Sequence, residues 1–302
     1  MSKNNTDLHI AGTHFEPPDA GRFVKRVNRS FPDKILWRTN RKSLISAMSL
    51  ITKTREELPL RVQTSAENGT ILQISQSAFR RFQYVTVTLL VALGTFHYVY
   101  ADTYGEDFIM LFTRMFDLGR EVTIPTAFSV LNLLISSILL FAIYRHSKSR
   151  GELITVYWLS LSIIFFVLSF DEGAGLHERF AKLQQYTGVL IPVIETHSWL
   201  LYGAVFTFVV FLFLIPFLRQ LDHRTAALFL LSGAIFVSGA LGFEFLGAWL
   251  LHNEIATRTD FIWSIRRIFE EGFEMYGIAL FNCTLFAHVV ANRVLLTLTG
   301  RP

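Results

Sequence analysis

Apolar residues are gathered into long runs that alternate with short polar segments. The runs cover residues 82–100, 124–144, 153–170, 199–218, 226–251 and 268–290. Each is close to the roughly 20 residues with which an α-helix crosses the hydrocarbon core of a bilayer. We therefore expect an all-α fold, a polytopic membrane helix bundle with about six transmembrane helices, formed by residues 82–302.

Residues 1–81 are polar and basic, so we expect them to form a cytoplasmic segment that is partly disordered. Within it, Leu44, Met48 and Ile51 recur at helical spacing and predict an amphipathic helix over residues 40–57. Such a helix suits an anionic lipid surface or a protein surface, and the sequence leaves both open. Membrane lipid is an expected partner, whereas no nucleic-acid-binding motif accompanies the basic residues.

Composition and charge agree with this architecture. Hydrophobic residues make up 51% of the chain, which is too apolar for an ordinary soluble domain. Of the 28 Lys and Arg residues, 14 precede Phe82, and others cluster at 145–150, at 219–224 and in the C-terminal tail. Because basic loops stay in the cytoplasm, we expect both termini there. The single Cys283 excludes an intrachain disulfide and a cysteine-based metal site within one chain.

Ionisable side chains gather at the opposite, outer ends of the expected spans. They are Asp171, Glu172, His177 and Glu178 after the third span, Glu244 in the fifth, and Glu270, Glu271 and Glu274 at the start of the sixth. Charge near hydrocarbon is costly, so such a cluster indicates a functional site. We expect the helices to bring these groups together beneath the outer headgroups.

The spacing of these residues predicts which of them meet after the third span. Asp171 and Glu178 share a face if the third helix continues through both of them. His177 then points elsewhere, unless Gly173 and Gly175 break the helix and redirect the chain.

In the sixth span, local pairs are expected to neutralise part of the charge. Arg266 precedes Glu270 by four residues, and Arg267 precedes Glu271 by four, so each arginine can pair with one carboxylate. This pairing leaves Glu274 deepest and without a local partner.

Other ionisable groups are expected in different environments. Glu244 lies between Phe243 and Phe245, so it must be protonated, paired or metal-bound. His197 is expected in a solvated outer loop. His97, close to two tyrosines, is expected in the aromatic belt at the membrane interface.

Carboxylates and imidazoles without a thiol suit iron, manganese or zinc. The candidate metal ligands are Asp171, His177, Glu178, Glu244, Glu271 and Glu274, and the candidate catalytic residues are Asp171, Glu178 and Glu274. The chain has no Glu-x-x-His pair for a soluble-type di-iron site, no His-Glu-x-x-His for a zinc protease and no Gly-x-Ser-x-Gly for a serine hydrolase.

The run Asp-Glu-x(4)-His-Glu at residues 171–178, followed by Glu-Glu-x-x-Glu at residues 270–274, resembles motifs in bacterial multi-pass membrane proteins of unassigned function. The resemblance covers these two short stretches and implies a multi-pass protein of the bacterial cytoplasmic (inner) membrane. It implies nothing about chemistry.

Three classes of function remain open. The first is a membrane enzyme with a metal-dependent or acid–base site that acts on a lipid-like or apolar substrate. The second is a structural or regulatory subunit, which would contact a partner through residues 1–81. The third is a proton- or cation-coupled transporter, whose buried carboxylates would resemble those of an enzyme.

Overall fold

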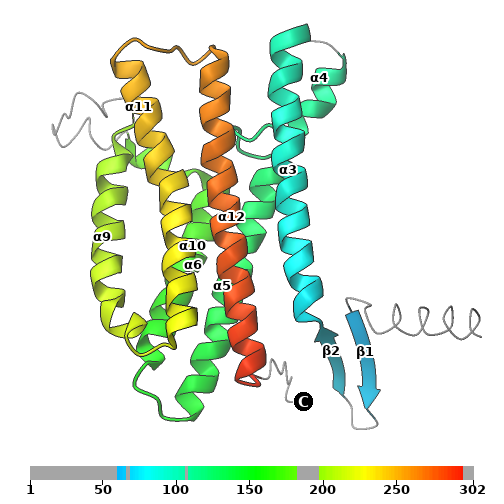
Figure 1. The fold of residues 1–302 in the computed structure, drawn as a ribbon, viewed down its shortest axis with the longest axis vertical. Helices are drawn as coiled ribbons and strands as arrows, with labels where there is room; N and C mark the ends of the chain where they lie inside the picture. The colour runs from blue at the N-terminus through cyan, green and yellow to red at the C-terminus, as the bar shows by residue number, and fades with distance from the viewer. Residues whose placement is uncertain (1–59, 66–68, 106–107, 182–196, 295–302) are drawn as a thin grey trace, which may run out of the picture. The chain divides into compact units, whose positions relative to one another are not determined.

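The computed structural model describes residues 60–65, 69–105, 108–181 and 197–294 (Figure 1). The amphipathic helix expected at residues 40–57 lies outside these ranges.

Six helices are long and apolar enough to cross a membrane, and they confirm the predicted bundle. They are α3 (Gln76–Tyr104), α5 (Ile124–Ser149), α6 (Thr155–Ala174), α9 (Trp199–Leu218), the continuous span His223–His252, and α12 (Phe261–Ala291). Short elements lie between them: α4 (Phe108–Thr113), η1 (Arg114–Phe116) and α7 (Leu176–Ala181). The chain is therefore an integral membrane protein.

The ends of these helices carry the signals that their sequences predict. Ser75 caps α3 by accepting a hydrogen bond from the backbone N–H of Ala78. Asp222 caps the helix that begins at His223 in the same way. Helix α6 ends at Gly175, whose φ of 56° is in the left-handed region that glycine adopts at low cost.

A β-hairpin precedes the bundle and was not predicted. Strands β1 (Leu60–Ser65) and β2 (Gly69–Ile74) pair antiparallel, with Leu60 opposite Ile74 and Ser65 opposite Gly69. The sequence does carry a hairpin signal, because Asn68 stands directly before Gly69 and the apolar Leu60 and Val62 alternate with polar residues in β1.

Helix α12 is central to the bundle, since it packs against α3, α5 and the span that precedes it (Figure 1). The main apolar core lies near the C-terminal end of α12. There the Trp158 ring packs edge-on against Phe217 and Phe229, and Leu285 is fully buried. This end also carries the basic links between α5 and α6 and between α9 and the next helix, and we call it the basic end.

Buried polar side chains join three helices in the middle of the bundle. Asn132 of α5 accepts a hydrogen bond from the Gln83 side chain at 2.8 Å, and its backbone carbonyl accepts one from Asn282 at 3.0 Å. The Asn282 side chain in turn accepts a bond from Ser136 at 2.7 Å. All four residues are almost completely buried, so the network ties α3, α5 and α12 together.

The fifth span changes its helical geometry before the site. It consists of α10 (His223–Val237), a π-helical segment η3 (Ser238–Phe243) and α11 (Glu244–His252). Gly239 lies so close to α12 that a Cβ built there would be 2.7 Å from the Glu270 carbonyl oxygen. A π-helical turn inside an α-helix often marks a functional site, and this one leads directly into Glu244.

Candidate functional site

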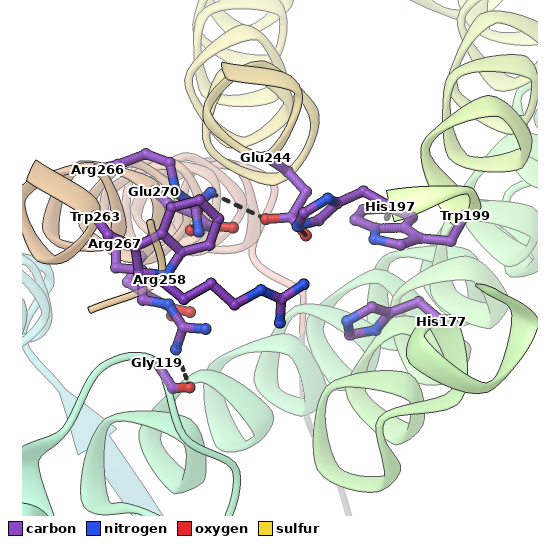
Figure 2. Close-up of a pocket in the computed structure, with 11 residues that line it drawn as sticks. Gly119, His177, His197, Trp199, Glu244, Arg258, Trp263, Arg266, Arg267 and Glu270 are labelled. Atoms are coloured by element: carbon purple, nitrogen blue, oxygen red, sulfur yellow. Dashed lines mark hydrogen bonds and ion pairs between the residues drawn. The ribbon is translucent and has the colours of Figure 1, made fainter. Parts of the chain in front are cut away.

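A cavity of about 320 Å³ lies at the end of the bundle opposite the basic end (Figure 2). Its walls come from α12, α11, the start of α9, α7 and the loop before α5. Three glutamates, three arginines, two histidines and two tryptophans line it, together with Gly119. The cavity is therefore polar and charged, although it lies in a membrane protein.

Arg266 organises one wall of this cavity. Its side chain is 3% exposed, and its Nη1 lies 3.0 Å from a carboxylate oxygen of Glu244 and 2.8 Å from one of Glu270. The same nitrogen donates to the carbonyl of Phe243 at 2.9 Å, and the guanidinium stacks on Trp263 with 4.4 Å to the ring centroid. One buried cation therefore holds two carboxylates from different helices.

The pairing in α12 is partly as predicted. The expected Arg266–Glu270 pair is present, but no ion pair joins Arg267 to Glu271 among the residues that the structure describes. Arg267 instead donates a hydrogen bond to the carbonyl of Gly119. Glu244, for which three states were open, is paired with Arg266.

His197 is buried, and its expected place in a solvated loop is wrong. It is 7% exposed, and its Nε2 lies 3.5 Å from a Glu244 carboxylate oxygen. Burial lowers the pKa of His197, and the nearby Glu244 carboxylate opposes part of that fall. The burial of His197 goes with its contact to Glu244, a residue far away in the sequence. The hydropathy of the sequence around His197 carries no information about such a contact.

Asp171 orients His177 at the other side of the cavity. The Asp171 carboxylate accepts a hydrogen bond from the His177 backbone N–H at 2.8 Å, and its second oxygen lies 3.1 Å from His177 Nδ1. The break at Gly175 makes this possible, because the chain turns there before α7 begins. The helix does break and redirect His177 as one alternative expected, but Gly175 alone makes the break, because Gly173 still lies within α6.

The loop before α5 is fastened to α3 by a second polar cluster. Tyr98 donates to Asp117 at 2.8 Å and accepts from the Gly119 N–H at 2.9 Å, while His97 lies 3.6 Å from Asp117 and 3.0 Å from Thr113. Burial alone would raise the pKa of Asp117, but hydrogen bonds from His97, Tyr98 and Gly119 outweigh it and lower the pKa. His97 is 3% exposed, so its expected place in the interfacial belt is wrong.

A second, much smaller cavity of about 10 Å³ lies further along α12, where Glu274 follows Glu271 by almost one turn. Glu172, Glu274, Ser129 and Asn132 are among its lining residues. A space of this size holds about one water molecule. Asn132 also belongs to the buried network with Gln83 and Asn282, so polar groups continue from this cavity into the bundle.

The candidate site residues are thus divided between the two cavities. His177, Glu244 and Glu271 line the larger one, with Asp171 bonded to His177, whereas Glu274 lines the smaller one. Glu178 lies on α7, and its side chain is outside the described part. Within the described ranges, no three His, Cys, Asp or Glu side chains are grouped as a metal ion requires. The iron, manganese or zinc centre stays a prediction.

Several lining residues escaped the sequence analysis. Trp199 and Trp263 read as ordinary apolar positions, and Gly119 carried no signal. Arg258 lies in the loop before α12, and Figure 2 shows its side chain extended into the cavity. Its contact with the Trp263 ring, at 5.9 Å to the centroid, is visible only in three dimensions.

A comparison with protein families places this arrangement in a wider group. Residues 83–289 match the model described as Domain of unknown function (DUF8692). No curated protein and no solved structure matches the chain. The match begins within α3 and ends within α12, so it includes both cavities and the network between them. The chain belongs to the DUF8692 family of proteins, whose function is unknown.

Proposed function

We propose that the protein is a membrane enzyme in which His177, held by Asp171, carries out acid–base chemistry on a lipid-like substrate. The observation that carries the proposal is an Asp–His pair whose histidine lines a polar cavity of about 320 Å³ in a membrane bundle. Cavities of this size bind small ligands, and a histidine oriented by a carboxylate is a common acid–base unit.

The pair defines the chemistry available to His177. Because Asp171 accepts at Nδ1, that nitrogen carries the proton in the neutral ring, and proton transfer takes place at Nε2. The backbone bond from His177 to Asp171 fixes the carboxylate at the same time. The ring also lies against Trp199, with centroids 5.1 Å apart, which restricts its rotation.

The ion pairs of two carboxylates favour an acid–base enzyme over a metal-dependent enzyme. Glu244 and Glu270 already share the guanidinium of Arg266, so a cation occupies the position that a metal ion would need. Arg266 instead joins Glu244 of α11 to Glu270 of α12 in the wall of the cavity.

The orientation is part of the same proposal. Basic residues cluster in the links 145–150 and 219–224, at the end away from the cavity. By the positive-inside rule that end faces the cytoplasm, and the cavity faces the outside of a bacterial inner membrane.

A second candidate is a proton- or cation-coupled transporter. The observation that favours it is the small cavity between Glu172 and Glu274, which reaches Asn132 and hence the buried network. If this candidate is right, proteoliposomes carry a proton or cation flux that Glu274→Gln abolishes. Silent proteoliposomes count against it.

The enzyme proposal is tested by lipid mass spectrometry on membranes from cells that make the wild type or a variant. We expect a lipid or apolar compound to change in amount with the wild type, the change to vanish with His177→Asn and to weaken with Asp171→Asn. His223→Asn is the matched control, because His223 is exposed at the basic end. If wild type and His177→Asn membranes have the same composition, the proposal is wrong.

A further inference from the structure

We infer that the larger cavity recognises its ligand through a phosphate group, and that Arg258 is the main residue that binds it. This inference rests on the proposed function and names the class of substrate. The phosphate can belong to a lipid head group or to a free phosphate ester, because both present the same oxyanion.

The charges that line the cavity are equal in number, three arginines and three glutamates, but they are unevenly paired. Arg266 is used by Glu244 and Glu270. Neither Arg258 nor Arg267 has a carboxylate within ion-pair distance in the described part of the chain, and Glu271 is the one lining carboxylate left to oppose them. The part of the wall that carries Arg258 and Arg267 is therefore locally positive, and an anion is the ligand that it favours.

Two buried donors lack partners beside this cavity. The Nε atoms of Arg266 and Arg267 are buried and have no hydrogen-bond partner in the described part of the chain. Arg266 is 4% exposed and lines the cavity, so its unused donor belongs to a built wall and not to a mobile surface. Both Nε atoms are enclosed by the protein, so the N–H groups at the ends of Arg258 and Arg267 are the donors that a ligand in the cavity would meet.

A phosphate fits this set of donors better than a carboxylate does. Guanidinium groups bind oxyanions through paired N–H donors, and a phosphate offers more acceptor oxygens to more than one arginine. Arg258 enters the cavity from the loop and rests on Trp263, while Arg267 is held from below by the Gly119 carbonyl (Figure 2). The two cations therefore come from different elements and can share one ligand.

The experiment measures binding and does not need turnover. Full-length protein in neutral detergent is titrated with dihexanoyl phosphatidate, dihexanoylglycerol, glycerol phosphate or inorganic phosphate, and binding is followed by calorimetry. We expect phosphatidate to bind and dihexanoylglycerol not to bind. Arg258→Gln should weaken phosphatidate binding on the order of tenfold, the scale of one charge-assisted contact. Arg219→Gln, an exposed arginine at the basic end, should bind like the wild type.

The outcomes distinguish a lipid head group from a free phosphate ester, and they distinguish phosphate recognition from the proposed acid–base chemistry. Tight binding of glycerol phosphate or inorganic phosphate supports a free phosphate ester, whereas binding of phosphatidate alone supports a lipid head group. Equal binding of phosphatidate and dihexanoylglycerol, no binding of any phosphate, or an Arg258→Gln variant that binds like the wild type overturns the inference. His177→Asn should still bind phosphatidate, so a loss of binding and a loss of acid–base chemistry are told apart.

Discussion

Replacing Arg266 by methionine should destabilise the bundle more than any other single arginine substitution in the described part. The change removes the cation between Glu244 and Glu270 and leaves two largely buried carboxylates without their partner. Methionine keeps an unbranched apolar side chain against Trp263, so the loss of packing is small.

The burial of the three groups sets the expected size of the effect. The side chains of Arg266, Glu244 and Glu270 are 3%, 16% and 12% exposed, so solvent screens them little. Removing one partner of a buried ion pair costs about 3–5 kcal/mol. The matched control is Arg150→Met, because the Arg150–Glu152 pair has a similar distance of 3.0 Å but exposures of 61% and 41%. An exposed pair contributes about 0–1 kcal/mol.

The assay is reversible unfolding in mixed micelles, followed by tryptophan fluorescence as the fraction of dodecyl sulfate increases. We expect Arg266→Met to unfold at a much lower fraction, and the further change Glu270→Gln to restore part of the loss, because it removes one of the two buried carboxyl groups that have lost their partner. The double-mutant cycle should depart from additivity by at least about 1 kcal/mol. An Arg266→Met protein as stable as the Arg150→Met control would refute the reasoning.

Three further changes test other parts of the structure. Burial lowers the pKa of His197 in the folded protein. As the pH falls below about 6.5, the histidine of the unfolded chain is therefore protonated before that of the folded protein. The free energy of unfolding should be retained above this pH and decrease below it. The thermal midpoint should therefore drop less between pH 8 and pH 5.5 in His197→Gln than in the wild type, and equal drops would contradict this. Gly239→Ala should cost about 1–3 kcal/mol, because its Cβ would meet the α12 backbone, whereas Gly233→Ala on the same span has open space and should be neutral or slightly stabilising in the same unfolding assay. Asn132→Leu should cost about 1–3 kcal/mol in that assay, since the buried Gln83 amide loses its acceptor, and an unchanged midpoint would mean that the network is not needed.

The spans were predictable because length and apolar content are local properties of the sequence. The start of α12 was not, since the prediction began at residue 268 and the helix begins at Phe261. Two arginines lie in that stretch, and they lowered its apparent hydropathy. Their burial depends on Glu244 and Gly119, which come from other elements.

The candidate site shows the same division between local and distant information. The sequence left open whether the helix breaks before His177; the break at Gly175 decides this and allows the bond between Asp171 and His177. The burial of His197 and the entry of Arg258 into the cavity depend on how α9 and the loop before α12 pack, and no spacing rule reports that. The spacing in the sequence predicted the Arg266–Glu270 pair, whereas the bond from Arg267 to Gly119 and the position of Arg258 depend on tertiary packing.

The direction in which the Glu244 side chain points depends on the number of residues in the π-helical segment Ser238–Phe243, which precedes α11. An α-helix turns by about 100° for each residue, so a chain shorter by one here would swing Glu244 through more than a quarter of the circumference. The carboxylate would then leave Arg266, although the span would still be long enough to cross the membrane. Insertions and deletions among natural variants of this protein should therefore avoid these six positions and accumulate in the connecting loops.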